Sequence, residues 1–396
     1  MDDISRRGFL HKSTAAAAGC AIPLKAGNLT SLQADGRPRV RRYKTFGRTG
    51  WKVGDISAGT WQADPALVEY QIQRGINLFD TAVEYPGHEE MLGRVLPRWR
   101  EKVFIIDKWE PTLVTPQVTK AKLLEELDLC LKRLKTTYID CMMIHAIGWP
   151  DLGDITRVQN PAIYEAFDAA KRLGKIRFTG ASGCGPRVLE EMEWGIDNDR
   201  FDVVLCGSNF LTHGLERVVK KARAKGIATM AMKTMTIFKS DLNIRGLINR
   251  QINARQAVIK YVLASDLFDT MIISMKNYQM VDDYLAVSGT TTLKTEDDEL
   301  LEFLGAAIGT MYCRPGCDEC FGSCPRDVPI WDILRYKMYF ENYGDQKYAI
   351  SRYGRIPESR RPPNCAGCDA PCERACCSKV QIRSCLLAAH QMLTLA

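Results

Sequence analysis

Short apolar runs alternate with longer amphipathic stretches over residues 55–288. Each apolar run has the length of a buried strand, and each amphipathic stretch repeats its apolar residues at the three-to-four spacing of a helix. Lys120–Leu134 is the clearest predicted helix. The eight predicted strands are Asp55–Thr60, Asn77–Thr81, Lys102–Lys108, Tyr138–His145, Ile176–Ser182, Phe201–Gly207, Ile227–Lys233 and Asp269–Met275.

Eight strand–helix units predict an α/β protein with a (β/α)8 TIM barrel. The alternative is a doubly wound open sheet, which needs a Gly-rich phosphate turn after its first strand. The first strand here ends in Gly59-Thr60-Trp61-Gln62, which is not that turn. A short hairpin is expected just before it, over residues 43–54, with Arg48-Thr49-Gly50 as its turn.

The same pattern divides the chain into three parts. Residues 1–42 are expected to be a signal and a polar linker, and residues 43–295 the barrel. Residues 296–396 are expected to form an α-helical, ferredoxin-like, cysteine-rich domain, which begins with a helix over 296–312.

The N-terminal segment carries the pattern of an export signal. Ser5-Arg6-Arg7-Gly8-Phe9-Leu10 precedes the Ala-rich stretch Ser13–Leu24, which resembles a twin-arginine signal. The sequence therefore predicts a periplasmic protein, and Ala18-Gly19-Cys20 leaves lipidation open. An ordinary N-terminal helix is the alternative. No apolar run approaches the ~18 residues that a membrane-spanning helix needs.

The net charge of +7 is confined to the start of the chain. Residues 1–50 hold ten Lys and Arg against three Asp, and the remainder is neutral. Nucleic-acid binding needs a basic stripe on the folded body, so it is not expected here.

Nine of the fifteen cysteines lie in two groups near the C-terminus. This spacing lets a short loop wrap several thiolates around one iron–sulfur cube, and a final Cys-Pro reach a second cube. One or two [4Fe-4S] clusters are therefore expected, with Cys377 left over. The predicted ligands are Cys313, Cys317, Cys320, Cys324, Cys365, Cys368, Cys372 and Cys376.

Two other readings of these cysteines remain open. Both groups depart from the usual C-x2-C-x2-C-x3-C-P spacing, because the first has an extra residue after Cys313 and the second has no proline after Cys376. A structural zinc site uses similar pairs, and disulfides can form after export.

Chemistry-bearing residues fall at the predicted strand ends, where barrels carry their active sites. Asp80, Lys108 and His145 end the second, third and fourth strands, and Tyr85 follows Asp80 by five residues. A carbonyl that accepts hydride needs a proton donor, and tyrosine serves when a neighbour stabilises its phenolate. Lys108 can do so, Asp80 can hold Lys108, and His145 can orient the carbonyl or share the proton.

Three segments together resemble the aldo-keto reductase family. They are Phe79–Tyr85, Ile106–Lys108 and Tyr138–His145, within a matching region of about residues 43–288. With its ferredoxin-like tail, the chain is similar to an iron–sulfur-containing bacterial branch. The resemblance implies reduction of aldehydes or ketones with NADPH or NADH, and a catalytic tetrad of Asp80, Tyr85, Lys108 and His145.

The resemblance extends less completely to the nucleotide site. Gly180-Ala181-Ser182-Gly183 is similar to the family's Gly-x-Ser-Asn, but Gly183 replaces the amide, and Leu205 stands where a Gln is common. It implies cofactor-binding roles for Ser182, Gly183, Asn209, Lys233 and Lys276. Lys276 is a candidate partner for a 2′-phosphate, which favours NADP over NAD.

These observations predict an exported oxidoreductase that exchanges hydride with a small carbonyl or alcohol. Its clusters would relay electrons to a redox partner protein or a quinone. Because the periplasm supplies no free NAD(P)H, any nucleotide is expected to be tightly held. The alternative is an electron-transfer or binding protein that kept the barrel and no longer uses nicotinamide.

Overall fold

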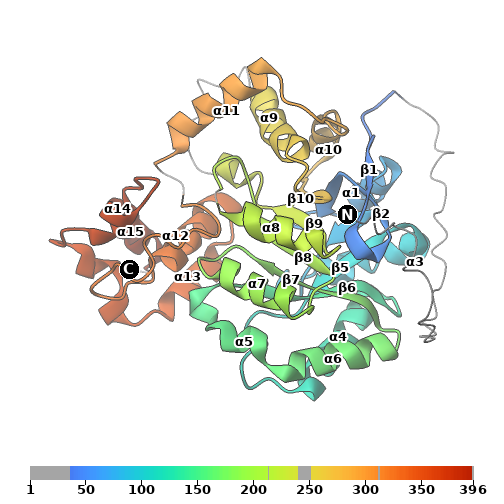
Figure 1. Ribbon diagram of the computed structural model, residues 1–396, viewed down its shortest axis with the longest axis horizontal. Coiled ribbons are helices and arrows are strands. Elements are labelled where there is room, and N and C mark those ends of the chain that lie inside the picture. Colours follow the sequence, from blue (N-terminus) through green and yellow to red (C-terminus); the bar gives the residue numbers. More distant parts are fainter. Residues whose placement is uncertain (1–35, 213, 240–250, 311–312, 395–396) are drawn as a thin grey trace, which may run out of the picture.

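The barrel is closed and built from eight parallel strands, as the computed structural model shows (Figure 1). The structure describes residues 36–212, 214–239, 251–310 and 313–394. The strand order around the barrel is β10-β3-β4-β5-β6-β7-β8-β9. The strands are β3 Ile56–Gly59, β4 Leu78–Asp80, β5 Phe104–Lys108, β6 Ile139–Ile147, β7 Ile176–Gly183, β8 Val203–Gly207, β9 Ala228–Met232 and β10 Thr270–Ser274. The predicted α/β barrel is therefore confirmed.

Helices cover the outside of the barrel between successive strands (Figure 1). They are α1 Pro65–Gln73, α2 His88–Leu92, α3 Leu96–Trp99, α4 Lys120–Leu134, α5 Ile155–Gln159, α6 Pro161–Arg172, α7 Val188–Asp197, α8 Leu215–Ala224, α9 Gln251–Ala264, α10 Tyr278–Leu285 and α11 Thr295–Ile308. α4 has the predicted bounds, because the Thr119 side chain caps its first turn and Lys135 ends it in a left-handed conformation.

A hairpin of β1, Tyr43–Thr45, and β2, Lys52–Gly54, closes the end of the barrel where the strands begin. Its Phe46 and Val53 are fully buried with Leu78, Phe104 and other inward-facing residues of the strands. Gly47 has a φ of 45°, and a side chain there would lie 2.3 Å from the Ala228 backbone. The barrel interior is thus a packed apolar core, which leaves the opposite end for a site.

The C-terminal region forms a helical unit with its own apolar core. It contains α12 Ile330–Met338, a π-helical turn Tyr339–Tyr343, α13 Gln346–Gly354, α14 Pro371–Ala375 and α15 Ile382–Leu393. Ile333, Tyr336 and Leu386 are among its buried residues. Figure 1 shows this unit beside the barrel, away from the hairpin. The helices in the described ranges are too short or too polar to cross a bilayer.

The helix α11 packs on the barrel rather than on the cysteine-rich unit. Its Leu301 and Leu304 share an apolar cluster with Ile237 and Ala257. The helix predicted over 296–312 is present but ends earlier, at Ile308, and residues 311 and 312 lie outside the described residues. The predicted domain boundary after residue 295 stays a prediction, and the packing favours a boundary beyond α11.

The C-terminal unit docks on the loops that follow β6 and β7. Asp151 accepts hydrogen bonds from Tyr336 and Arg352 of the unit. Close by, Trp149 meets Trp331 edge-on, with ring centroids 5.3 Å apart. Since these loops stand at the carboxyl ends of the strands, the unit lies against the barrel's functional end.

Candidate active site

Asp80 and Lys108 meet at the ends of two neighbouring strands. β4 and β5 pair in parallel, with Asp80 opposite Ile106. The Lys108 ammonium lies 2.6 Å from Asp80 Oδ1 and donates a 2.6 Å hydrogen bond to the Thr81 carbonyl. Burial raises the pKa of Asp80, and the charge of Lys108 opposes that rise. The pair therefore fixes a cation at the floor of the pocket.

Tyr85 stands above this pair on the loop after β4. Lys108 Nζ is 5.5 Å from the centre of its ring, and His145 meets the ring edge-on at 6.1 Å. Burial and the charge of Asp80 raise the pKa of Tyr85 well above its ordinary value. Burial and the charge of Lys108 lower the pKa of His145 well below its ordinary value. At neutral pH, Tyr85 is thus a protonated phenol beside a neutral imidazole.

A cavity of about 160 Å³ brings all four residues of the predicted tetrad together. Its walls come from the carboxyl ends of β3 to β7, β9 and β10, as expected for a site in such a barrel. Three tyrosines of the C-terminal unit, Tyr339, Tyr343 and Tyr348, also line it. The site is thus shared between the barrel and the C-terminal unit.

The tyrosines contact charged residues of the barrel. Lys233, directly after β9, lies 5.6 Å from the ring centre of Tyr339 and 5.3 Å from that of Tyr343. Tyr348 hydrogen bonds with the side chain of Glu84. These contacts make the aromatic wall a fixed part of the pocket.

The predicted nucleotide-binding residues divide into two sets. Ser182, Gly183 and Lys233 line the cavity, whereas Asn209 and Lys276 are not among its lining residues. Asn209 is used within its own turn, where its side chain accepts from the Leu211 amide. Lys276 is exposed just before α10. The predicted roles of these two residues stay predictions.

Ser182 and Gly183 differ in what they offer a cofactor. Ser182 Oγ is buried and has no hydrogen-bond partner among the described residues. At Gly183, a Cβ would lie 2.4 Å from the Ile147 carbonyl, so no side chain fits there. Ser182 therefore suits the carboxamide of a nicotinamide, while the amide missing at Gly183 could not be restored without moving β6.

The eight predicted cysteine ligands gather around two further cavities. Cys313, Cys317, Cys320 and Cys376 line one of about 400 Å³. Cys365, Cys368 and Cys372 line a smaller one. Cys324 lines both cavities, and its electrostatic partners are Cys365 and Cys372. The last cysteine of each group thus lies with cysteines of the other group.

This exchange suits two iron–sulfur cubes, in which each Cys run supplies its fourth thiolate to the other cube. The Val328 amide donates to Cys324 Sγ at 3.4 Å, and the Val380 amide donates to Cys376 Sγ at 3.4 Å. Burial raises the pKa of Cys313 to about 12 and that of Cys365 to about 11. A bound metal centre would deprotonate such thiols. None of the described cysteines forms a disulfide in this structure.

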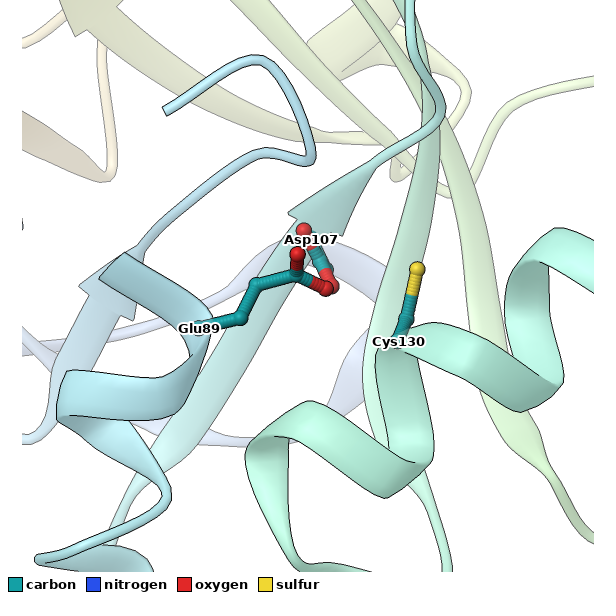
Figure 2. Close-up of side chains that lie close together, drawn as sticks. All are labelled: Glu89, Asp107 and Cys130. Atoms are coloured by element: carbon teal, nitrogen blue, oxygen red, sulfur yellow. The ribbon is translucent and has the colours of Figure 1, made fainter. Parts of the chain in front are cut away.

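A separate acidic pair lies outside the barrel wall (Figure 2). Glu89 of α2 and Asp107 of β5 turn their carboxyl groups toward each other, beside Cys130 of α4. Arg133 forms an ion pair with Glu89 at 2.7 Å. Burial, and then Glu89, raise the pKa of Asp107 well above its ordinary value. Asp107 therefore keeps its proton and bridges to Glu89, which ties α2 to the strand that carries Lys108.

Sequence reasoning missed three residues of the site region: Glu84, Tyr348 and Asp151. Glu84 directly precedes Tyr85, so its position in the motif was the available signal. Tyr348 lies at the site only because the C-terminal unit docks there, and Asp151 of the barrel gains its partners Tyr336 and Arg352 by the same docking. No local sequence pattern indicates either contact.

Comparison with known proteins agrees with this geometry. Residues 50–237 match the sequence model of the Aldo/keto reductase family. Aldo-keto reductase YhdN of Bacillus subtilis is 28% identical over 173 residues, which cover 38% of this chain and 49% of that protein. Methylglyoxal reductase YeaE of Escherichia coli is 30% identical over 151 residues, which cover 37% and 48%. The chain thus spans about half the length of the curated relatives it matches.

The solved structure of aldo-keto reductase AKR11C1 from Bacillus halodurans, in its holo form, has a similar fold. It superposes with a TM-score of 0.53 and 20% identity, covering 66% of this chain and 96% of that one. The barrel, the tetrad at its mouth and the sequence match agree with one another: over residues 50–237, the chain is similar to the aldo/keto reductase family.

Proposed function

We propose that this protein is an oxidoreductase that transfers hydride between NAD(P)H and a small carbonyl or alcohol, coupled to an electron relay through [4Fe-4S] clusters. One observation carries the proposal: Tyr85, Lys108, Asp80 and His145 all line one pocket at the barrel mouth. The family supports the reaction class, and the aromatic walls support a small substrate.

Side chains of this protein carry out the proton transfer of the reaction. Tyr85 holds a proton that it can donate to the oxygen of a bound carbonyl, since its pKa is raised. The Lys108 ammonium, held by Asp80 at 2.6 Å, stabilises the phenolate that remains. Neutral His145 orients the carbonyl oxygen beside the Tyr85 hydroxyl.

Nicotinamide, when bound, supplies the hydride. Ser182 would hold its carboxamide, because Ser182 Oγ is buried and has no other partner among the described residues. Lys233 offers a positive charge at the cavity wall. NADP is the proposed form, although the exposed position of Lys276 gives that preference no support from the pocket.

The two cysteine sets are proposed to hold [4Fe-4S] clusters, which accept or donate single electrons. Cys313 lies beside the site, because it packs with Trp149, Cys184 and Trp331. Two of these residues, Trp149 and Cys184, also line the pocket. A redox partner protein or a quinone is the proposed electron exchanger.

Export remains part of the proposal. The twin-arginine motif and the lipidation motif at Cys20 lie outside the described residues. They support a periplasmic protein, and a protein in that compartment would need to retain its nucleotide through catalytic cycles.

The test is Tyr85→Phe in protein purified without oxygen. The variant should lose carbonyl reduction by about 10²–10⁴-fold, the usual contribution of a proton donor, and should keep its iron. The matched control is Tyr278→Phe, which changes a tyrosine that is 49% exposed and does not line the pocket. Reduction that survives in Tyr85→Phe would contradict the proposed role of the tetrad.

A second candidate is an electron carrier that no longer binds nicotinamide. The closed backbone at Gly183 favours it, since no amide side chain fits there. In that case neither NADPH nor NADH would bind to the purified protein, and Tyr85→Phe would leave electron transfer by the clusters unchanged.

A further inference from the structure

Glu84 is a pocket residue to which the tetrad assigns no role. It lines the cavity beside Tyr85, and its side chain is 21% exposed. Its Oε2 lies 3.5 Å from Nδ1 of His145. That nitrogen is buried and has no hydrogen-bond partner among the described residues. A small movement would therefore join the carboxyl and the imidazole in a hydrogen bond.

Every element around Glu84 presents a titratable or charged group to it. Tyr348 and Arg352 come from α13, Glu110 follows β5, and Lys233 follows β9. His145, on β6, completes the set. Burial raises the pKa of Glu84 to about 7, while the hydrogen bond from Tyr348 opposes the rise. The protonated and ionised forms of Glu84 are thus both populated near neutral pH.

We propose that Glu84 exchanges a proton with His145 and so renews the proton that Tyr85 gives to the substrate. The inference rests on the proposed function, because it concerns the same reaction. In the step, the O–H bond of Glu84 breaks and an N–H bond forms at Nδ1 of His145. The proton on Nε2 passes to the Tyr85 phenolate, which leaves neutral His145 as its Nδ1–H tautomer. To close the cycle, Nε2 takes a proton from solvent and the Nδ1 proton returns to the Glu84 carboxylate, so both residues regain their starting forms.

The contact with Tyr348 makes the C-terminal unit part of this relay. The same segment that covers the pocket also fixes the carboxyl whose proton is exchanged. A rival explanation is that Glu84 only anchors Tyr348 and thereby holds the unit in place. The two explanations predict different variants to be harmful.

Three variants separate these explanations. Glu84→Gln keeps an oxygen that accepts from Tyr348 but cannot deliver a proton. Tyr348→Phe removes the hydrogen bond and leaves the carboxyl in place. Glu110→Gln is the matched control, because it removes a nearby carboxyl that does not line the pocket.

The first measurement is the pH dependence of kcat for carbonyl reduction. The wild type should be fast below pH 7 and slow above it, because Glu84 acts as donor in its protonated form. Glu84→Gln should lower kcat by about 10²-fold and abolish the decrease of kcat above pH 7. Tyr348→Phe and Glu110→Gln should retain this decrease. A decrease that persists in Glu84→Gln, or that disappears only in Tyr348→Phe, would overturn the relay.

The second measurement does not depend on turnover. Infrared difference spectra of wild type and Glu84→Gln should show one protonated-carboxyl band that titrates near pH 7, and His145→Gln should shift it. No band, or a band insensitive to His145→Gln, would refute the exchange. A shifted band in a protein that reduces no carbonyl would instead refute the proposed function.

Discussion

Asp80 and Lys108 form an ion pair of 2.6 Å whose side chains are only 7% and 1% exposed. Each charge is removed from water, so each depends on the other for compensation. The pair also carries the proposed chemistry, since the lysine faces Tyr85. This one contact therefore affects both the stability and the activity of the protein, and variants can separate the two effects.

Lys108→Met should destabilise the fold by about 3–5 kcal/mol, because it leaves the Asp80 carboxylate buried without a partner. The double variant Asp80→Asn/Lys108→Met should recover most of that loss while still lacking carbonyl reduction. Urea unfolding measures the stability of both variants, and an activity assay measures their carbonyl reduction. Equal stability of Lys108→Met and the wild type would show that Asp80 does not need the lysine.

Asp107→Asn should stabilise the protein increasingly as the pH rises. The raised pKa of Asp107 means that the folded protein holds a proton that the unfolded chain has lost. This contribution of Asp107 is fully present below its unfolded pKa and is lost as pH rises through the folded one. The advantage of the variant should begin near pH 4 and grow by about 1.4 kcal/mol per pH unit up to the folded pKa.

The measurement is the free energy of unfolding of wild type and Asp107→Asn between pH 4 and pH 8. Asn preserves the acceptor for the Lys108 amide, which donates to Asp107 Oδ1 at 2.8 Å. A constant difference across this range would mean that Asp107 is ionised in the folded protein.

Asp151→Asn should loosen the C-terminal unit from the barrel. It removes the charge that pairs with Arg352, a side chain only 7% exposed. Hydrogen exchange should become faster in α12 and α13, and remain unchanged in α4 on the distant side of the barrel. Exchange that is unaltered in α12 and α13 would mean that the aromatic contact of Trp149 with Trp331 suffices for docking.

In the proposed arrangement, the fourth cysteine of each group binds the cluster of the other group. This arrangement predicts which cluster each cysteine variant loses. Cys324→Ala should halve an iron content of about eight per chain. The remaining cluster should give the electron paramagnetic resonance spectrum found in Cys368→Ala. If it gave the spectrum of Cys317→Ala instead, Cys324 would belong with its own group. Cys377→Ala is the control and should keep all its iron.

The hydrophobic pattern predicted the barrel well because every strand is buried and short. Its errors are at strand ends, where side chains take other partners. Asp55 was predicted to begin the first strand, but its carboxylate accepts hydrogen bonds from Ser288 and the Gly289 amide. The fourth strand continues past His145 through an irregular stretch in which Ala146 has a φ of 54°. Nothing in the local composition indicates the hydrogen bonds of Asp55 or the irregular stretch after His145.

The tetrad was predictable because a barrel places strand ends together. The remainder of the site was not, because it depends on how the C-terminal unit docks. Only the structure places Tyr339 beside Lys233 and Tyr348 beside Glu84. Asn209 and Lys276 were selected by position in a motif, and their cofactor-binding roles stay predictions.

The central claim is that one chain joins a nicotinamide-dependent barrel site to two iron–sulfur clusters. The most direct test is the content of iron, sulfide, zinc and nicotinamide nucleotide in protein purified without oxygen. The account predicts about eight iron and eight sulfide per chain, one nucleotide and no zinc. Zinc in place of iron, or iron with no nucleotide and no binding of added NADPH or NADH, would contradict it.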